Sequence, residues 1–225
     1  MNKRLIIGIA LIVVGVCVAS VPFLMNARDE SKGEELLANI ESGNVIFEVP
    51  ALDETVAELD LWDFQSEAVK AANATVAAPT PNPTGTKKIL GIGSIRIDKI
   101  DLTQPLVEGC GKTELQYAVG HLSQTPFPGQ PGNCVLAGHR NYTYGKMFNR
   151  LEEVAVGDKI VITTSDKAQY TYEVFNTLIV EPGDSSVLTG TADEHKLTLI
   201  TCTPVVVATH RFIVQANLIE SIPPK

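Results

Sequence analysis

Three residues in the second half of the chain have the chemical types that a thiol-based acyl transfer requires. They are Cys202, His139 and Arg211, and each lies at the end or the start of an apolar run. A cysteine nucleophile needs a proton-accepting partner, most often a histidine, and an electropositive group near the carbonyl oxygen under attack. The residue types therefore suggest a nucleophile, an acid/base and a carbonyl-binding group.

The elements that must position these residues are read as strands. Leu197–Thr201 is apolar and β-branched, which favours a strand, and Pro204 ends it because proline lacks the N–H that a sheet ladder uses. Cys134–Gly138 is a second such run, and Arg211–Val214 opens a third. Two strands thus end in Cys and His while a third begins with Arg. The chemistry requires that the three converge over one sheet edge.

Three motifs resemble those of one enzyme family. Thr198–Cys202 reads Thr-Leu-Ile-Thr-Cys, similar to the Thr-Leu-x-Thr-Cys signature of the sortases, which are transpeptidases that join proteins to the envelope of Gram-positive bacteria or to one another. Leu136–Arg140 and Thr209–Arg211 resemble the histidine and arginine segments of that family, in the same order and spacing. The resemblance covers roughly residues 89 to 218. It implies a mostly β fold, a closed eight-stranded β-barrel with short helices.

The resemblance also implies roles for individual residues. Cys202 would be the nucleophile, His139 the acid/base and Arg211 the group that holds the substrate carbonyl. Thr201 and Thr209 would contact the substrate, and no cofactor is expected. His121, which follows Tyr117–Gly120, is similar to a Gly-His that the family places ahead of the catalytic histidine, and we interpret it as structural.

The activity implied is cleavage of a Leu-Pro-x-Thr-Gly-like sorting signal between Thr and Gly through a thioacyl-enzyme, followed by attack of an amine. A pilin lysine is the first hypothesis for the amine, since Thr201–Pro204 and Thr209–Arg211 look most like class C, the pilin-polymerising sortases. A peptidoglycan-precursor amine used for cell-wall anchoring is the second. A secreted cysteine protease on the same barrel, and a membrane-tethered adhesion module with an inert Cys202, are further alternatives.

Composition excludes several other classes of protein. The net charge of −8 argues against a nucleic-acid partner, because phosphate binding requires clustered Lys and Arg. The sequence contains neither a Gly-rich phosphate loop nor a Cys-x-x-Cys pair, which leaves nucleotide and structural zinc sites without support. The carboxylates Asp184, Asp193 and Glu194 do not have the spacing of a recognised calcium loop, so we expect no metal.

The amino terminus predicts the compartment. Lys3 and Arg4 precede Leu5–Met25, an uncharged apolar run of the length that crosses a bilayer as a helix. Residues 1–4 would form a cytoplasmic tail, residues 5–25 a signal-anchor in the cell membrane, and the catalytic domain would be extracellular. A cleaved signal peptide is the alternative, because Ala19 and Ser20 are small enough for processing.

Residues 26–86 are predicted to be an extracellular spacer before a catalytic domain at 87–225. Helical spacing at Glu34–Ile40 and again near Asp53–Ala72 is followed by a proline-rich linker at Ala78–Gly85. Within the spacer, Asp60 and Trp62 resemble the Asp and aromatic residue of the lid that precedes the barrel in class C sortases. Simple packing of Trp62 on a neighbouring element is the alternative.

Two further expectations concern thiols and strand faces. An extracellular location permits disulfides, so Cys110 and Cys134 could pair and leave Cys202 free; free buried thiols are equally allowed. His210 precedes Arg211 in the same predicted strand, and successive side chains point to opposite faces. His210 should therefore lie outside the site if Arg211 lies inside it.

Overall fold

The computed structural model describes residues 31–51, 85–140, 147–205 and 207–224. The predicted membrane segment at 5–25, the helical pattern near 53–72 and almost all of the proline-rich linker lie outside these ranges. Within them, no helix is long and apolar enough to span a membrane.

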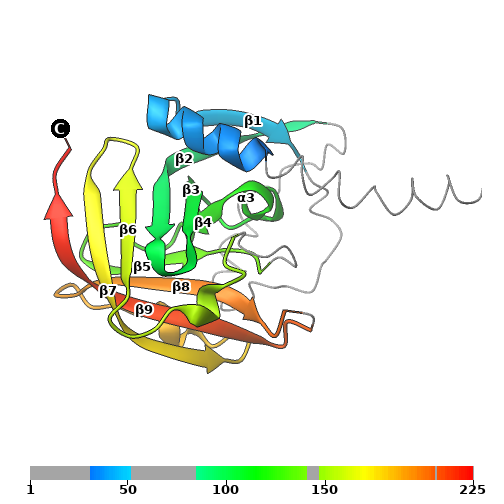
Figure 1. Ribbon diagram of the computed structural model, residues 1–225. Helices are drawn as coiled ribbons and strands as arrows, with labels where there is room; N and C mark the ends of the chain where they lie inside the picture. The colour runs from blue at the N-terminus through cyan, green and yellow to red at the C-terminus, as the bar shows by residue number, and fades with distance from the viewer. Residues whose placement is uncertain (1–30, 52–84, 141–146, 206, 225) are drawn as a thin grey trace, which may run out of the picture.

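The described elements are mostly strands (Figure 1). The strands are β1 (Ile46–Pro50), β2 (Thr86–Ile97), β3 (Leu102–Glu108), β4 (Val119–His121), β5 (Gly132–Ala137), β6 (Lys159–Thr164), β7 (Gln169–Val180), β8 (His195–Thr203) and β9 (His210–Ile222). The helical elements are a helix over 31–42, α3 (Lys112–Tyr117) and the 3-10 turns η1 (Asp98–Ile100), η2 (Leu151–Glu153) and η3 (Ser185–Leu188).

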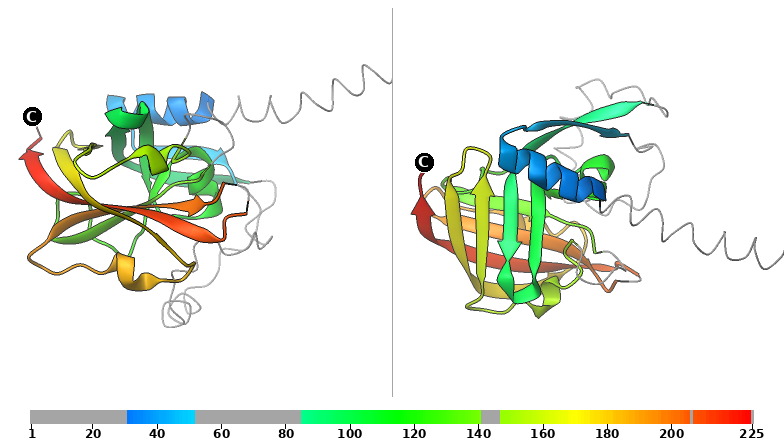
Figure 2. Two further views of the ribbon diagram at one scale, coloured as in Figure 1. Left: turned by 60° about the horizontal axis from the view of Figure 1, so that its bottom comes forward. Right: turned by 45° about the horizontal axis from the view of Figure 1, so that its top comes forward.

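Eight of these strands close into a barrel. The sheet order is β1-β2-β3-β4-β5-β8-β9-β7-β6, and β2 also pairs with β6, so the strands from β2 to β6 form a ring. The expected eight-stranded closed barrel is therefore confirmed. The two views of Figure 2 show the strands wrapping around one core, with β8 and β9 crossing behind β2, β6 and β7 in the right-hand view.

Closure of the ring depends on a glycine in β2. Gly93 has φ of 157° and lies at a register shift between β2 and β3, while its other side pairs with Thr164 of β6. A Cβ at this position would lie 2.2 Å from the Thr163 carbonyl oxygen. A side chain there would push β6 away, so glycine allows the two edges of the barrel to meet.

The core fills the inside of the ring. Alternate residues of each strand point inward, as the period-2 patterns of the sequence predict. Leu197 and Leu199 of β8, Leu136 of β5 and Val214 of β9 are all fully buried in this cluster. The other face of these same strands carries the neighbouring residues, including Cys202, and is therefore where a site can be built.

Residues 31–51, which fall in the segment predicted as a spacer, pack against the barrel. Strand β1 pairs with the first half of β2, and the helix over 31–42 lies on that pair through Leu36 and Ile40 (Figure 1). Gly91 permits this contact, since a Cβ there would meet Ile40 at 2.6 Å. Lys167 of the β6–β7 turn donates to the Glu41 carbonyl at 2.6 Å, which satisfies one free carbonyl near the helix end.

Candidate active site

The sheet register brings two of the three candidate residues face to face. Strands β8 and β9 are antiparallel, and Cys202 pairs directly with Arg211 in their register. Directly opposed residues of two strands share one face of the sheet, with Cβ atoms about 5 Å apart. The Cys202 thiol and the Arg211 guanidinium therefore project from adjacent strands on the same face.

His139 follows the strand that borders β8 on its other side. Strands β5 and β8 are parallel, and their ladder ends with the pairing of Ala137 and Ile200. The Gly138 N–H then donates to the Ile200 carbonyl at 3.1 Å, and the Thr201 hydroxyl donates to the Gly138 carbonyl at 2.8 Å. These bonds tie Gly138, which precedes His139, to Ile200 and Thr201, which precede Cys202. The Phe148 N–H holds the His139 carbonyl at 3.0 Å.

Arg211 is buried at the mouth of the β8–β9 connection. Only 2% of the residue is exposed, and its Nη1 donates to the carbonyls of Ala208 at 3.1 Å and His210 at 3.0 Å. Burial lowers the pKa of this guanidinium, while the opposed Cys202 raises it. An arginine keeps its charge under any such shift, so a fixed positive charge faces the sulfur.

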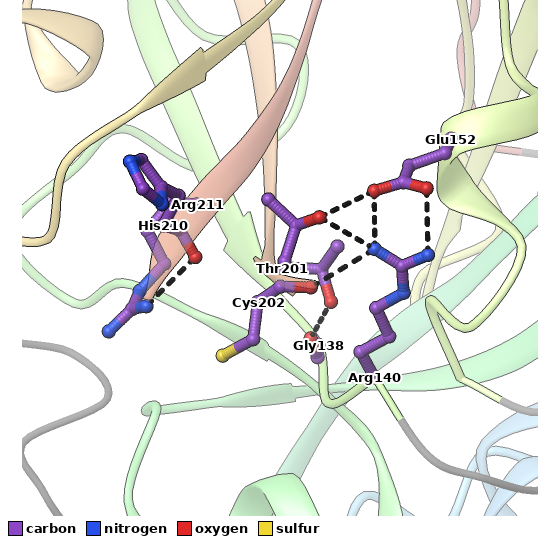
Figure 3. Close-up of polar contacts among 8 residues, drawn as sticks. Gly138, Arg140, Glu152, Thr201, Cys202, His210 and Arg211 are labelled. Carbon is purple, nitrogen blue, oxygen red and sulfur yellow. Dashed lines mark hydrogen bonds and ion pairs between the residues drawn. The ribbon is translucent and has the colours of Figure 1, made fainter. Parts of the chain in front are cut away.

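The Cys202 side chain is a free thiol in a mixed environment. The residue is 6% exposed. Burial raises the pKa of the thiol above its ordinary value, whereas the charges of Arg211 and Arg140 lower it, and burial is the larger effect. Figure 3 shows the sulfur pointing away from Arg140, while the backbone carbonyl of the same residue faces that arginine. A thiol with a raised pKa needs a base to take its proton when it attacks.

The sequence reasoning missed an ion pair on the other side of the nucleophile. Arg140 donates to both carboxylate oxygens of Glu152 in η2, at 2.5 and 2.8 Å, and to the hydroxyl of Thr203 at 3.0 Å (Figure 3). The pKa of Glu152 is lowered, first by the hydrogen bond from Arg140, so the carboxylate is ionised at neutral pH. The only sequence signal for this pair was that Arg140 directly follows His139. Its partner Glu152 lies 12 residues downstream, and no local motif marks it.

This arrangement was compared with known proteins. Residues 95–219, which carry all three candidate residues, match a family model described as a sortase domain. The chain belongs to the sortase family. Sortase D of Bacillus subtilis (strain 168) is 35% identical over 112 residues, covering 50% of this chain and 54% of that protein. The match thus spans about half the length of this relative.

Two solved structures of sortases are similar in fold. A Clostridium perfringens sortase D5 transpeptidase has a TM-score of 0.58 and 28% identity, with 85% of this chain and all of that chain covered. A pilus-related sortase C of Group B Streptococcus has a TM-score of 0.55 and 30% identity, covering 58% of this chain and 68% of that one. The similarity therefore includes both a class D and a class C structure.

The sortase domain places the other predicted site residues as follows. Thr201 is fully buried, and its hydroxyl donates a hydrogen bond to the Gly138 carbonyl. Thr209 is exposed, with its hydroxyl 2.9 Å from Nδ1 of the equally exposed His210. Asp60 and Trp62 lie outside the described residues. The position of His210 away from the buried Arg211 agrees with the expected strand alternation.

His121 is part of the interior of this sortase rather than its surface. It is fully buried, with Nδ1 2.7 Å from Glu108 and Nε2 3.1 Å from the Pro126 carbonyl, and its ring stacks on Phe127 at 4.8 Å. Burial raises the pKa of Glu108, but the hydrogen bonds from His121 and Ser123 together lower it by more. The pKa of Glu108 is therefore below its ordinary value. The cluster joins β3, β4 and the loop before β5, and Phe127 forms its partly exposed edge.

The outer face of the sheet continues from Cys202 into an apolar cluster of the sortase domain. Val135, Ile200 and Ile213 lie on this face, covered by Val187 of η3. The buried Asn133 amide donates to the Val187 carbonyl at 3.0 Å and accepts from Thr198 at 2.8 Å, which fixes the β7–β8 connection there. Cys202 thus lies at one end of this buried apolar cluster.

The remaining thiols and carboxylates form no further centre in the described part of the chain. Cys110 and Cys134 are both free, so the possible disulfide between them is absent. Asp184 accepts from the Ser186 N–H as a cap of η3, and Glu194 accepts from the Thr191 N–H. Among the described residues there is no group of three His, Cys, Asp or Glu that could hold a metal ion.

Proposed function

We propose that this sortase is a cysteine transpeptidase that cleaves a Leu-Pro-x-Thr-Gly-like sorting signal between Thr and Gly and joins the new carboxyl end to an amine. The observation that carries the proposal is the direct pairing of Cys202 with Arg211, while the segment that leads to His139 is bonded to the strand of Cys202 through Gly138. A nucleophile, a cation and an imidazole on three adjacent chain segments are the groups that acyl transfer through a thioester requires.

The first half of the reaction forms the acyl-enzyme. The Cys202 sulfur passes its proton to His139 and attacks the carbonyl carbon of the Thr–Gly bond, while Arg211 stabilises the negative charge that develops on the carbonyl oxygen. The C–N bond then breaks, and His139 returns the proton to the leaving glycine amine. The product is a thioester between Cys202 and the threonine carboxyl carbon.

The second half transfers the acyl group. An incoming primary amine gives a proton to His139 and attacks the thioester carbonyl, and the sulfur of Cys202 leaves and recovers its proton. Thr201 supports this chemistry indirectly, because its hydroxyl links the nucleophile strand to Gly138 next to His139. Thr209, at the exposed mouth of the β8–β9 connection, is the threonine available for contact with substrate.

The proposed substrates are surface proteins with such a signal, and the first acceptor to test is a pilin lysine. The similarity to a pilus-related sortase C supports this acceptor, and a peptidoglycan-precursor amine is the second to test. We further propose that residues 5–25 anchor the chain in the cell membrane with the catalytic domain outside, and that Asp60 and Trp62 form a lid over the site.

The test is a ligation assay with the full chain in detergent. The enzyme is incubated with a Leu-Pro-x-Thr-Gly peptide and either a lysine-containing pilin-like peptide or an oligoglycine, in parallel with Cys202→Ala. Ligated product that is lost in Cys202→Ala supports the transpeptidase, and the better acceptor identifies the amine. Hydrolysis at the same rate with and without acceptor would instead identify a protease.

The lid is tested in the same assay with Trp62→Ala. Faster turnover in this variant supports a lid that covers the site. Unchanged turnover with an unchanged KM would assign Trp62 to packing elsewhere.

A further inference from the structure

The ladder between β5 and β8 ends just before His139 and Cys202, although Cys202 itself stays paired with Arg211 of β9. The pairing of β5 with β8 ends at Ala137 and Ile200, whereas His139 and Cys202 each lie two residues beyond. The Gly138 N–H still bonds to the Ile200 carbonyl, one residue before His139. Beyond that bond, side-chain hydrogen bonds connect the two segments.

Arg140 provides such bonds, and it does so directly after His139. Its guanidinium donates to the Thr203 hydroxyl at 3.0 Å and contacts the Cys202 carbonyl at 3.4 Å (Figure 3). Arg140 is the residue after His139, and Thr203 is the residue after Cys202. One planar guanidinium thus connects the neighbour of the histidine to the neighbour of the nucleophile.

Glu152 completes the connection from a third segment. Its carboxylate takes two bonds from Arg140, and its Oε1 also accepts from the Thr203 hydroxyl at 2.6 Å. Each pair within Arg140, Glu152 and Thr203 is therefore bonded. A bidentate Arg–carboxylate pair has a fixed geometry. The triangle of Arg140, Glu152 and Thr203 therefore fixes the segment after β5 and the end of β8 relative to η2.

The cost of the pair argues that it serves position more than stability. The Arg140 side chain is 9% exposed, and its Nε is, within the described residues, a buried atom with no hydrogen-bond partner. A buried N–H left unpaired costs about 1–3 kcal/mol. The Glu152 side chain is 39% exposed, and ion pairs with an exposed partner commonly contribute little to stability.

We propose that Arg140 and Glu152 are positioning residues that hold His139 and Cys202 in the geometry for proton transfer. The charge of Arg140 has a second effect, since it lowers the pKa of the Cys202 thiol from the side opposite to Arg211. The activity readout rests on the proposed function, whereas a thiol-alkylation readout does not.

The chain contains a matched control for the ion pair. Glu153, the next residue of η2, forms the same kind of two-point pair with Arg150, at 2.7 and 2.8 Å, and Arg150 donates to the Ile100 carbonyl rather than to β8. Glu152→Gln and Glu153→Gln are therefore the same substitution in the same kind of pair, one residue apart. Arg140→Lys adds a variant that keeps the positive charge but cannot form the two-point hydrogen bonding of a guanidinium with the carboxylate.

The experiment measures kcat and KM for peptide ligation and the rate of Cys202 alkylation by iodoacetamide, for the full chain in detergent. A 1 Å misplacement of reacting groups can cost about 100-fold, so kcat should fall about 10- to 100-fold in Glu152→Gln and Arg140→Lys. KM and the thermal midpoint should change little, and Glu153→Gln should match the parent. Alkylation at pH 7 should slow in the first two variants only.

Arg140→Met separates charge from position. The midpoint of its alkylation–pH profile should shift to higher pH, because a positive charge near the sulfur is lost, while Arg140→Lys should react more slowly but keep the parental midpoint. The proposal is overturned if Glu152→Gln and Arg140→Lys both retain parental kcat and alkylation rate, or if Glu153→Gln loses as much as Glu152→Gln. If the parent does not process the peptide, the proposed function fails and the alkylation rates alone decide this inference.

Discussion

Cys134 and Cys202 lie on neighbouring strands of one sheet, and their surroundings differ in a way that explains which thiol can react. Cys134 of β5 points into the barrel, where it packs in the apolar core. Cys202 of β8 points to the other face, opposite Arg211. Both are buried and both are free.

The two thiols also differ in their electrostatics. Burial raises the pKa of Cys134 far above its ordinary value, and the charge of Glu108 raises it further. Burial raises the pKa of Cys202 as well, but two arginine charges oppose the rise. The comparison shows that burial alone does not decide reactivity. The cations, which β9 and the segment after β5 supply on one face only, make the difference.

The largest expected effect tests which thiol does the chemistry. Cys202→Ala should lower ligation by at least about 1000-fold, because loss of a nucleophile removes the covalent route. Cys134→Ala should keep activity within about threefold at a temperature where it remains folded. Product formation measured by mass spectrometry checks both variants. Substantial activity in Cys202→Ala would assign the nucleophile elsewhere.

The next effect tests the cation that distinguishes the two sites. Arg211→Met should lower kcat about 100- to 1000-fold, as expected for loss of a group that stabilises an oxyanion. The control is Arg96→Met, since Arg96 of β2 is an exposed arginine that pairs with Asp98 of η1. Steady-state kinetics of the two variants should differ by most of that factor. Equal losses would show that Arg211 acts only through stability.

Chemical modification sharpens the same contrast without a substrate. Iodoacetamide should label Cys202 in the native protein and leave Cys134 unlabelled until the chain unfolds, because only the thiolate reacts. Since the pKa of Cys202 is raised, its labelling rate should still be rising at pH values above the ordinary thiol pKa of about 8.5. Peptide mapping across a pH series measures this. A plateau near neutral pH would contradict the raised pKa.

The smallest effect concerns stability. Cys134→Ser places a hydroxyl in an apolar core and should cost about 1–3 kcal/mol in the free energy of unfolding. Cys202→Ser should cost less than about 1 kcal/mol, because arginine donors and the site opening are next to it. Urea unfolding of both variants gives the difference. A larger loss in Cys202→Ser would mean that this side chain is a packing residue.

The fold could be predicted largely from local pattern together with the family motifs. The alternating segments Tyr170–Phe175 and Gly91–Ile97 lie in β7 and β2 as expected. Apolar residues at every second position indicate a strand with one buried face. The helical spacing at Glu34–Ile40 likewise lies in the helix over 31–42. That this helix and β1 pack on the barrel was not readable, since β1 pairs with residues about 40 positions later in the chain.

The sequence by itself determined the residue types of the site and the strands that carry them. Cys202, His139 and Arg211 are each marked by a local motif and by the end of an apolar run. Only the tertiary structure decided that Cys202 and Arg211 are directly opposed, and that Arg140, Glu152 and Thr203 form a bonded triangle beside them. The physical reason is that strand patterns depend on neighbours in sequence, whereas strand register and ion pairs between segments depend on which distant segments meet.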